Sequence, residues 1–213
     1  EGLGNKFLSH IREVDAIIHM IRCFDSDDIQ NVNPSVDPVR DLEIIETEMK
    51  LADLDSIQKR LDKKQKKNTS EKEQKLLETA LKLINDDKNL SILREEFDEN
   101  ELNKSSLLSI KPKLYVCNVD EESIKSGNNY TKEFITKFGN EDTIIISAEI
   151  ESQINDLSTD QEKESYMKMI NIETTGLDLL IRKGYNLLSL QTFFTSGPEE
   201  SRAWTIPRNS IAP

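Results

Sequence analysis

Three short apolar segments stand out along the chain, and each is followed at once by polar residues. They occupy residues 16–24, 114–117 and 143–147. Continuous apolar runs of this length are typical of strands that are covered on both faces in a parallel sheet. Apolar residues also recur at helical spacing over 5–14, 130–138 and 176–188, and Asn5 is suited to cap the first of these helices. The alternation of strands and helices predicts an α/β fold with a doubly wound parallel sheet.

A long helical hairpin is predicted between the first two strands. Pro38, preceded by Asp37, is suited to the first position of a helix, and an amphipathic pattern then runs over 39–67. Ser70 and Glu73 have the spacing of a capping box, which predicts the start of a second helix. The apolar face of this second helix consists of Leu76, Leu77, Ala80, Leu83 and Ile84. We therefore expect an antiparallel helical hairpin inserted into the sheet domain.

The end of the chain has a different pattern. Residues 190–195 and 202–206 are rich in β-branched and aromatic side chains, with a Gly-Pro turn between them. This pattern predicts a β-hairpin that begins a separate, small β-rich domain. The expected organisation is a sheet domain at 1–37 and 111–188, an inserted hairpin at 38–110, and a truncated β-domain at 189–213.

Charge and composition narrow the classes of function. The formal net charge of −12 and a pI near 4.8 argue against a nucleic-acid protein held mainly by bulk electrostatics. No apolar run approaches the roughly 20 residues of a membrane span. Cys23 and Cys117 each lie inside an apolar run, which favours core residues in a reducing compartment over a disulfide or a metal site. We expect a cytoplasmic protein, and we expect no metal ligands within this sequence.

The candidate site lies where the second and third strands end. Asn118 and Glu121 follow one strand and Ser147-Ala148 follow the next, and the carboxyl ends of parallel strands are where α/β proteins bind ligands. An amide and a carboxylate at this place suit a planar, hydrogen-bonding ligand such as a nucleobase, with the backbone of Val119 and Ala148 as further contacts. Asn-x-x-Glu is a weak pattern, however, and the alternative is that Asn118 and Glu121 only cap the next turn.

Two motifs in this region resemble those of GTP-binding P-loop proteins, which carry Asn-Lys-x-Asp after one buried strand and Ser-Ala-Lys after the next. Asn118-Val-Asp-Glu121 and Ser147-Ala-Glu149 stand in those places and in that order. The sequence is similar to the YchF, or Obg-like ATPase, family of P-loop NTPases. Further segments that resemble this family are 2–10, 16–24, 37–41, 46–54, 176–178, 192–195 and 202–206.

The resemblance implies part of a P-loop NTPase domain, an inserted antiparallel coiled-coil hairpin and the start of a TGS domain of β-grasp type. It implies an enzyme that binds and hydrolyses ATP in preference to GTP, requires Mg²⁺ and associates with ribosomes. Asn118, Val119, Glu121, Ser147 and Ala148 would surround the base. Without the Lys-x-Asp of guanine-binding proteins, the loop lacks the carboxylate geometry that holds the guanine N1 and N2 hydrogens, so adenine is not rejected.

The resemblance also has gaps. Gly2 and Gly4 match only the tail of the second switch, and the sequence contains no Gly-rich loop with Lys and Ser or Thr for the phosphates. No catalytic residue can therefore be named, and the magnesium ligands would lie before Glu1. Because the chain lacks a starting Met and an obvious final stop, we expect that both ends are cut. We expect the portion given to be inactive by itself.

The alternative function is a non-catalytic interaction module that binds a ribosome, RNA or a protein through the hairpin and the β-domain. Its strongest feature is the basic end of the first hairpin helix, which is a candidate contact for rRNA. The alternative interpretation is a solvated helix terminus, and the sequence alone leaves both interpretations open. The basic residues concerned are Lys59, Arg60, Lys63, Lys64, Lys66 and Lys67.

Overall fold

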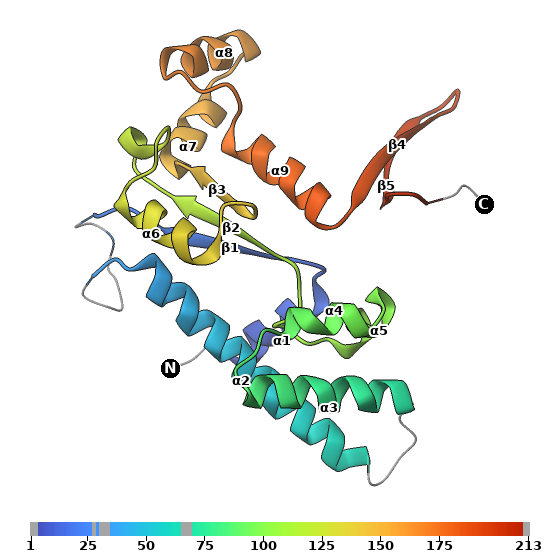
Figure 1. Cartoon of the computed structure of the whole chain (residues 1–213). Coiled ribbons are helices and arrows are strands. Elements are labelled where there is room, and N and C mark those ends of the chain that lie inside the picture. The colour runs from blue at the N-terminus through green and yellow to red at the C-terminus, as the bar shows by residue number, and fades with distance from the viewer. Residues whose placement is uncertain (1–3, 27–28, 30–34, 65–69, 211–213) are drawn as a thin grey trace. The chain divides into compact units, whose positions relative to one another are not determined.

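The computed structural model describes residues 4–26, 29, 35–64 and 70–210 of the chain, and it confirms the predicted α/β class (Figure 1). The chain divides into two compact units, Glu1–Ile17 with Asp41–Pro112, and Ile18–Arg40 with Lys113–Pro213. The elements, in chain order, are α1 (Asn5–Glu13), β1 (Ile17–Arg22), α2 (Pro38–Lys64), α3 (Glu71–Asn85), η1 (Leu90–Ile92), α4 (Leu93–Glu96), α5 (Glu99–Ser105), β2 (Lys113–Asn118), η2 (Glu121–Ser123), α6 (Asn129–Phe138), β3 (Thr143–Ile146), α7 (Ala148–Asp156), α8 (Asp160–Met169), α9 (Gly176–Leu187), β4 (Leu190–Ser196) and β5 (Ser201–Pro207). The predicted domain boundaries after residues 37, 110 and 188 remain a prediction.

The two long helices of the hairpin begin where the sequence predicts. Helix α2 starts at Pro38, and the Asp37 carboxylate accepts a hydrogen bond from the backbone N–H of Arg40 at 2.9 Å. Helix α3 is capped by Ser70, whose hydroxyl accepts from the N–H of Glu73 at 3.2 Å. The expected capping box is only half formed, because the Glu73 carboxylate binds the guanidinium of Arg60 at 2.6 Å. A charged partner on the neighbouring helix replaces the backbone N–H that a capping box would use.

The core of the first unit lies between α2, α3 and the short helices that follow. The predicted apolar face of α3 is confirmed, since Leu76, Leu77, Ala80 and Leu83 are all buried. This face packs with Ile57 of α2 and with buried side chains of the returning segment, namely Leu90, Leu93, Phe97, Leu102, Leu107 and Ile110. A second cluster joins α1 to the middle of α2 through Leu8, Met49 and Leu108. Packing on these apolar faces, rather than helix propensity, stabilises the hairpin.

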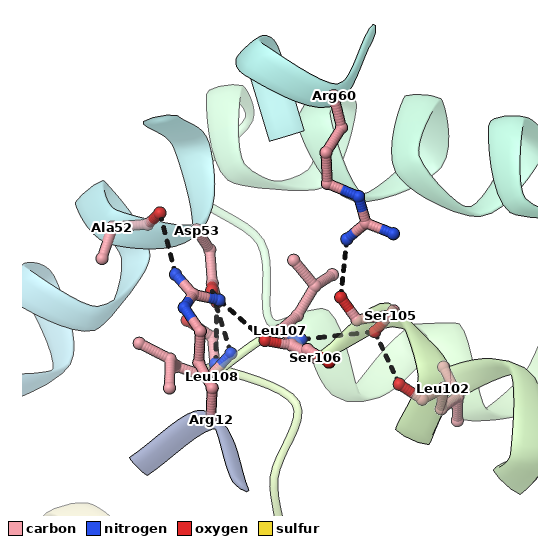
Figure 2. Close-up of polar contacts among 10 residues, drawn as sticks. Arg12, Ala52, Asp53, Arg60, Leu102, Ser105, Ser106, Leu107 and Leu108 are labelled. Atoms are coloured by element: carbon pink, nitrogen blue, oxygen red, sulfur yellow. Dashed lines mark hydrogen bonds and ion pairs between the residues drawn. The ribbon is translucent and has the colours of Figure 1, made fainter. Parts of the chain in front are cut away.

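A buried carboxylate organises the polar interior of this unit (Figure 2). Asp53 of α2 is fully buried and accepts hydrogen bonds from the N–H groups of Leu108 at 2.9 Å and Ser109 at 2.8 Å. Arg12 of α1 lies 3.3 Å from the same carboxylate and also donates to the carbonyl of Ser106 at 2.7 Å. Asp53 thus joins three segments that are far apart in the sequence.

The sheet of the second unit has the order β1-β2-β3. Strands β2 and β3 are parallel, with Tyr115 paired to Thr143 and Asn118 paired to Ile146. Strand β1 runs in the same direction as β2, because the N–H of Ile17 at its start donates to the carbonyl of Pro112 at 2.9 Å and the N–H of Cys23 at its end donates to that of Asn118 at 2.8 Å. All three strands therefore release their loops at one edge of the sheet, where the candidate base-binding residues lie.

Helices pack on the two faces of this sheet at β2 and β3. On one face, Tyr115 of β2 contacts Phe134 and Phe138 of α6, with ring centroids 5.5 Å and 5.9 Å apart. On the other face, Leu180 of α9 packs on a cluster that consists of Val116, Ile144 and Ile146. Gly176 begins α9 so close to the sheet that a Cβ atom there would lie 2.5 Å from Cγ2 of Ile146. The absence of a side chain at Gly176 is what permits this close approach.

Two sequence-based expectations about the first elements are wrong. Asn5 is the first residue of α1 rather than its cap, and Gly4 takes the capping position without a side-chain hydrogen bond. Strand β1 is not covered on both faces by the described residues, since Ile18 and Met20 are 51% and 60% exposed. A run of apolar residues indicates that each side chain would be more stable when buried. It does not indicate which segment of the protein packs against each face of the strand.

The predicted β-hairpin at the end of the chain is confirmed. Strands β4 and β5 pair antiparallel, with Phe193 opposite Trp204. The side chains of Phe194 and Trp204 are 79% and 44% exposed. A two-stranded hairpin has little stability in isolation. These exposed aromatic side chains are large apolar surfaces on which further packing could stabilise it. Whether this hairpin begins a TGS domain remains a prediction.

Candidate functional site

Asn118 connects two strand ends. It is the last residue of β2, and its Oδ1 atom accepts a hydrogen bond from the N–H of Ala148, the first residue of α7, at 2.9 Å. The loops at 118–121 and 147–148, called the base loops from here on, are therefore tied to each other by a side chain. The turn that follows β2 is capped by Asp120, which accepts from the N–H of Ser123 at 2.8 Å. The alternative role for Asn118, as a cap for that turn, is thus filled by another residue.

The other members of the base loops differ in what they can offer a ligand. Val119 is buried, and its N–H donates to the carbonyl of Ile146 at 2.8 Å. Ser147 is also buried, and its hydroxyl caps α7 by accepting from the N–H of Ile150. Ala148 and Glu121 are exposed. Val119 and Ser147 thus fix the backbone of the loops, while Asn118, Glu121 and Ala148 can contact a ligand.

Glu121 is held by helix α7. Its Oε1 atom accepts a hydrogen bond from Nε2 of Gln153 at 2.6 Å. The other end of the Gln153 amide accepts a hydrogen bond from the hydroxyl of Tyr166 on α8. The sequence analysis did not identify Gln153 or Tyr166. Both lie on exposed-looking, strongly polar helices, and no motif separates them from ordinary surface residues.

The loop after β1 lies against the same edge of the sheet. The carbonyl of Cys23 accepts a hydrogen bond from Nδ2 of Asn128 at 2.6 Å, and Tyr130 donates to the carboxylate of Asp25 at 2.9 Å. This hydrogen bond to Asp25, more than burial, raises the pKa of the Tyr130 hydroxyl. Helix α6 therefore anchors the loop after β1 beside the base loops.

The two cysteines are buried beneath these loops, as expected. A hydrogen bond with Cys117, and then burial, raise the pKa of the Cys23 thiol far above its ordinary range. The same hydrogen bond lowers the pKa of Cys117. A buried thiol with a raised pKa is protonated and packs as a small apolar side chain.

The remaining predicted residues that the structure describes belong to the first unit, whereas the base loops belong to the second. Gly4 caps α1 with its carbonyl, which accepts from the N–H of Phe7 at 2.8 Å, and Gly2 falls outside the described residues. At the basic end of α2, Lys59 pairs with Asp55 at 2.6 Å, and Arg60 binds Glu73 and the carbonyl of Ser105. Lys63 and Lys64 end α2 with side chains that are not described, and Lys66 and Lys67 lie outside the described residues.

A metal ion has no evident ligand set in the described part of the chain. Among those residues, no group of three or more His, Cys, Asp or Glu side chains could hold one. The magnesium ion that the sequence resemblance implies is therefore not assigned to any residue, and no chemical step is derived from it. The described helices also include none with the length and apolar composition that crossing a bilayer requires.

A parallel sheet with helices on both faces and polar loops at the strand ends is part of the α/β fold of P-loop NTPases. No protein-family model matches the chain. The chain is 40% identical over 224 residues to the ribosome-binding ATPase YchF of Haemophilus ducreyi, and 39% identical over 224 residues to that of Bacillus subtilis. Both alignments include the whole chain and 60% or 61% of the relative. The structure of the Schizosaccharomyces pombe YchF GTPase matches 99% of this chain and 60% of that one, with a TM-score of 0.81 and 30% identity.

The chain is similar over its whole length to members of the YchF, or Obg-like ATPase, family, which supports the resemblance predicted from its motifs. It spans about 60% of the length of the relatives that it matches. The bacterial relatives are named ATPases and the fission-yeast relative is named a GTPase, so the names differ on the nucleotide.

Proposed function

We propose that the chain forms the base-binding part of an ATPase that associates with ribosomes. The observation that carries this proposal is the hydrogen bond between Oδ1 of Asn118 and the N–H of Ala148, which holds the two base loops together at the ends of β2 and β3. Because Oδ1 is engaged by Ala148, the amide presents its Nδ2 donor to a ligand, which suits an acceptor nitrogen of a purine. Ribosome binding and ATP hydrolysis are named for the bacterial relatives, and both supply the rest of the proposal.

Preference for ATP over GTP follows from the chemistry of the first base loop. Val119 stands where guanine-binding P-loop proteins have Lys, and Glu121 stands where they have Asp. A buried carboxylate that clamps two guanine N–H groups rejects adenine strongly, because adenine would leave it unpaired. Glu121 is exposed and already bonded to Gln153, so adenine leaves no such unpaired buried group.

Hydrolysis requires groups that position the phosphates, and the sequence of this chain contains no Gly-rich loop with Lys and Ser or Thr. The roles derived for its own residues are therefore to bind and orient the base. Magnesium, when bound with the nucleotide, would neutralise phosphate charge. We also propose that the protein works in the cytoplasm, where ribosomes are, and that the β4–β5 hairpin belongs to a TGS domain.

The test is to measure ATP and GTP binding to the full-length protein by calorimetry with Mg²⁺ present, together with phosphate release. We expect ATP to bind more tightly than GTP and to be hydrolysed. Failure of both nucleotides to bind at millimolar concentration would show that the nucleotide-binding proposal is wrong. Tighter binding of GTP would contradict only the base preference.

A second candidate function is a non-catalytic interaction module. It is favoured by the basic end of α2, where five Lys residues and one Arg lie within 59–67 of a chain whose net charge is −12. A local positive segment in an acidic protein can contact an RNA backbone without general affinity for nucleic acid. Ribosome association without nucleotide binding would support this second candidate over the first.

A further inference from the structure

The Glu121 carboxylate belongs to a short chain of hydrogen bonds that crosses three elements. Gln153 of α7 donates to Oε1 of Glu121 at 2.6 Å, and the Tyr166 hydroxyl of α8 donates to Oε1 of Gln153. Glu121 itself is exposed, whereas Gln153 and Tyr166 are half-buried between the two helices. Glu121 stands where guanine-binding proteins have their Asp. The position of its carboxylate therefore depends on side chains of α7 and α8.

The direction of these hydrogen bonds follows from what each group can donate or accept. An ionised carboxylate only accepts, so the Gln153 amide must turn its Nε2 group towards Glu121. This orientation leaves Oε1 of Gln153 facing Tyr166, whose hydroxyl can donate to it. Tyr166 thereby satisfies the acceptor end of the amide and stabilises the only orientation in which Gln153 can hold Glu121.

The consequence for a base concerns the two carboxylate oxygens. Guanine presents two adjacent N–H donors on its pairing edge, at N1 and N2, and a carboxylate recognises this pair best when both of its oxygens are available. Adenine presents the N6 amino group beside an acceptor nitrogen, and it offers no such pair of donors. With Oε1 bound to Gln153, one acceptor position of that oxygen is occupied and the carboxylate is held in one orientation, so Glu121 is less free to accept both guanine donors.

We propose that Gln153, positioned by Tyr166, is a specificity-determining residue that disfavours guanine by engaging one oxygen of Glu121. This inference rests on the proposed function, because it requires that Glu121 borders the bound base. Gln153 does not touch the base in this scheme. It acts through Glu121, and Tyr166 acts through Gln153.

The first experiment compares the affinities of ATP and GTP in the full-length protein and in its Gln153→Leu variant. Leucine has a similar size but donates no hydrogen bond, so the occupied acceptor position on Oε1 is freed and the Glu121 carboxylate can turn towards guanine. We expect the ratio of ATP affinity to GTP affinity to fall about tenfold, the scale of one hydrogen bond to a charged group. Gln74→Leu is the matched control, because Gln74 also donates to a glutamate, Glu78, at 2.7 Å but lies on α3 outside the base loops.

The second variant, Tyr166→Phe, removes one hydroxyl and keeps the ring. We expect a smaller fall of the same ratio, and no further fall when Tyr166→Phe is added to Gln153→Leu, because Tyr166 acts only through the amide. A purely structural role of Tyr166 would instead give additive losses of stability without a change in the ratio. This variant also decides the question if Gln153→Leu does not fold.

The outcomes separate this inference from the proposed function. An unchanged ratio in both single variants, or an equal loss of affinity for both nucleotides, overturns the role of Gln153 while ATP binding by the wild type keeps the proposed function intact. Absence of ATP and GTP binding by the wild type overturns both proposals. A ratio that falls in the Gln74→Leu control as well would also contradict a role specific to Gln153.

Discussion

Asn118 is a half-buried residue at the end of β2, and its hydrogen bonds help to distinguish a role in folding from a role in ligand binding. Its side chain could stabilise the fold, bind a ligand or do both. The backbone between the two strand ends is already joined by the bond from Val119 to Ile146, which does not involve the Asn118 side chain. The bond to Ala148 therefore adds orientation of the base loops to a sheet that is paired without it.

We predict that Asn118→Ala weakens ATP binding by the full-length protein about tenfold and leaves its fold intact, since it removes one hydrogen bond between the base loops and one donor to the base. Calorimetry gives the affinity, and circular dichroism with a urea titration checks the fold. Asn155→Ala, at an exposed position of α7, is the control and should bind ATP as the wild type does. Unchanged affinity of the Asn118 variant would argue against the assigned pocket.

Among the elements, the helical hairpin makes its buried polar contacts with α1 and the segment 108–109 through Asp53 in the middle of α2. Figure 2 shows how the carboxylate, Arg12 and the segment 105–108 meet. Arg60 lies about two helical turns after Asp53 and donates to the carbonyl of Ser105. The next carbonyl, that of Ser106, accepts from Arg12. Ser106 has a positive φ of 55°, so this return of the chain has a strained turn that two guanidinium groups hold in place.

We predict that Asp53→Ala lowers the free energy of unfolding by about 3 kcal/mol, because it leaves buried N–H groups at Leu108 and Ser109 without an acceptor and Arg12 without its ion pair. Urea unfolding measures the free energy, and faster amide hydrogen exchange at Leu108 and Ser109 locates the loss. Asp55→Ala is the matched control on the same helix. Asp55 makes an exposed ion pair with Lys59, so its loss should cost no more than about 0.5 kcal/mol. Equal effects of the two variants would contradict the role assigned to Asp53.

On the scale of the whole molecule, the alignment with the YchF relative from Haemophilus ducreyi includes the whole of this chain but only 60% of the relative. Base binding, as proposed, involves residues of the second unit, whereas the basic end of α2 belongs to the first unit. Nucleotide binding and ribosome binding can therefore be tested separately by variants in different units. Arg60 has roles inside the hairpin, so the lysines are the better choice for a test of RNA contact.

We predict that replacing the lysines within 59–67 by glutamine weakens ribosome co-sedimentation of the full-length protein and reduces its dependence on salt. Each lost phosphate contact should lower the slope of log affinity against log salt by about one. Co-sedimentation at a low and a high salt concentration measures this, and glutamine at the exposed residues Lys132 and Lys168 is the control. No change at either salt concentration would remove this segment from consideration as the ribosome contact.

The sequence by itself determined the class of fold, the hairpin and the place of the base loops. Periodicity and capping residues are local properties, so Pro38, the apolar face of α3 and the strand before Asn118 could be predicted without knowledge of their partners. Tertiary structure alone decided which polar groups meet. Glu73 binds Arg60 instead of completing a capping box, and Gln153 holds Glu121, because these partners are brought together only by the packing of separate elements. Side-chain partners depend on distances between segments, and no local pattern in the sequence encodes those distances.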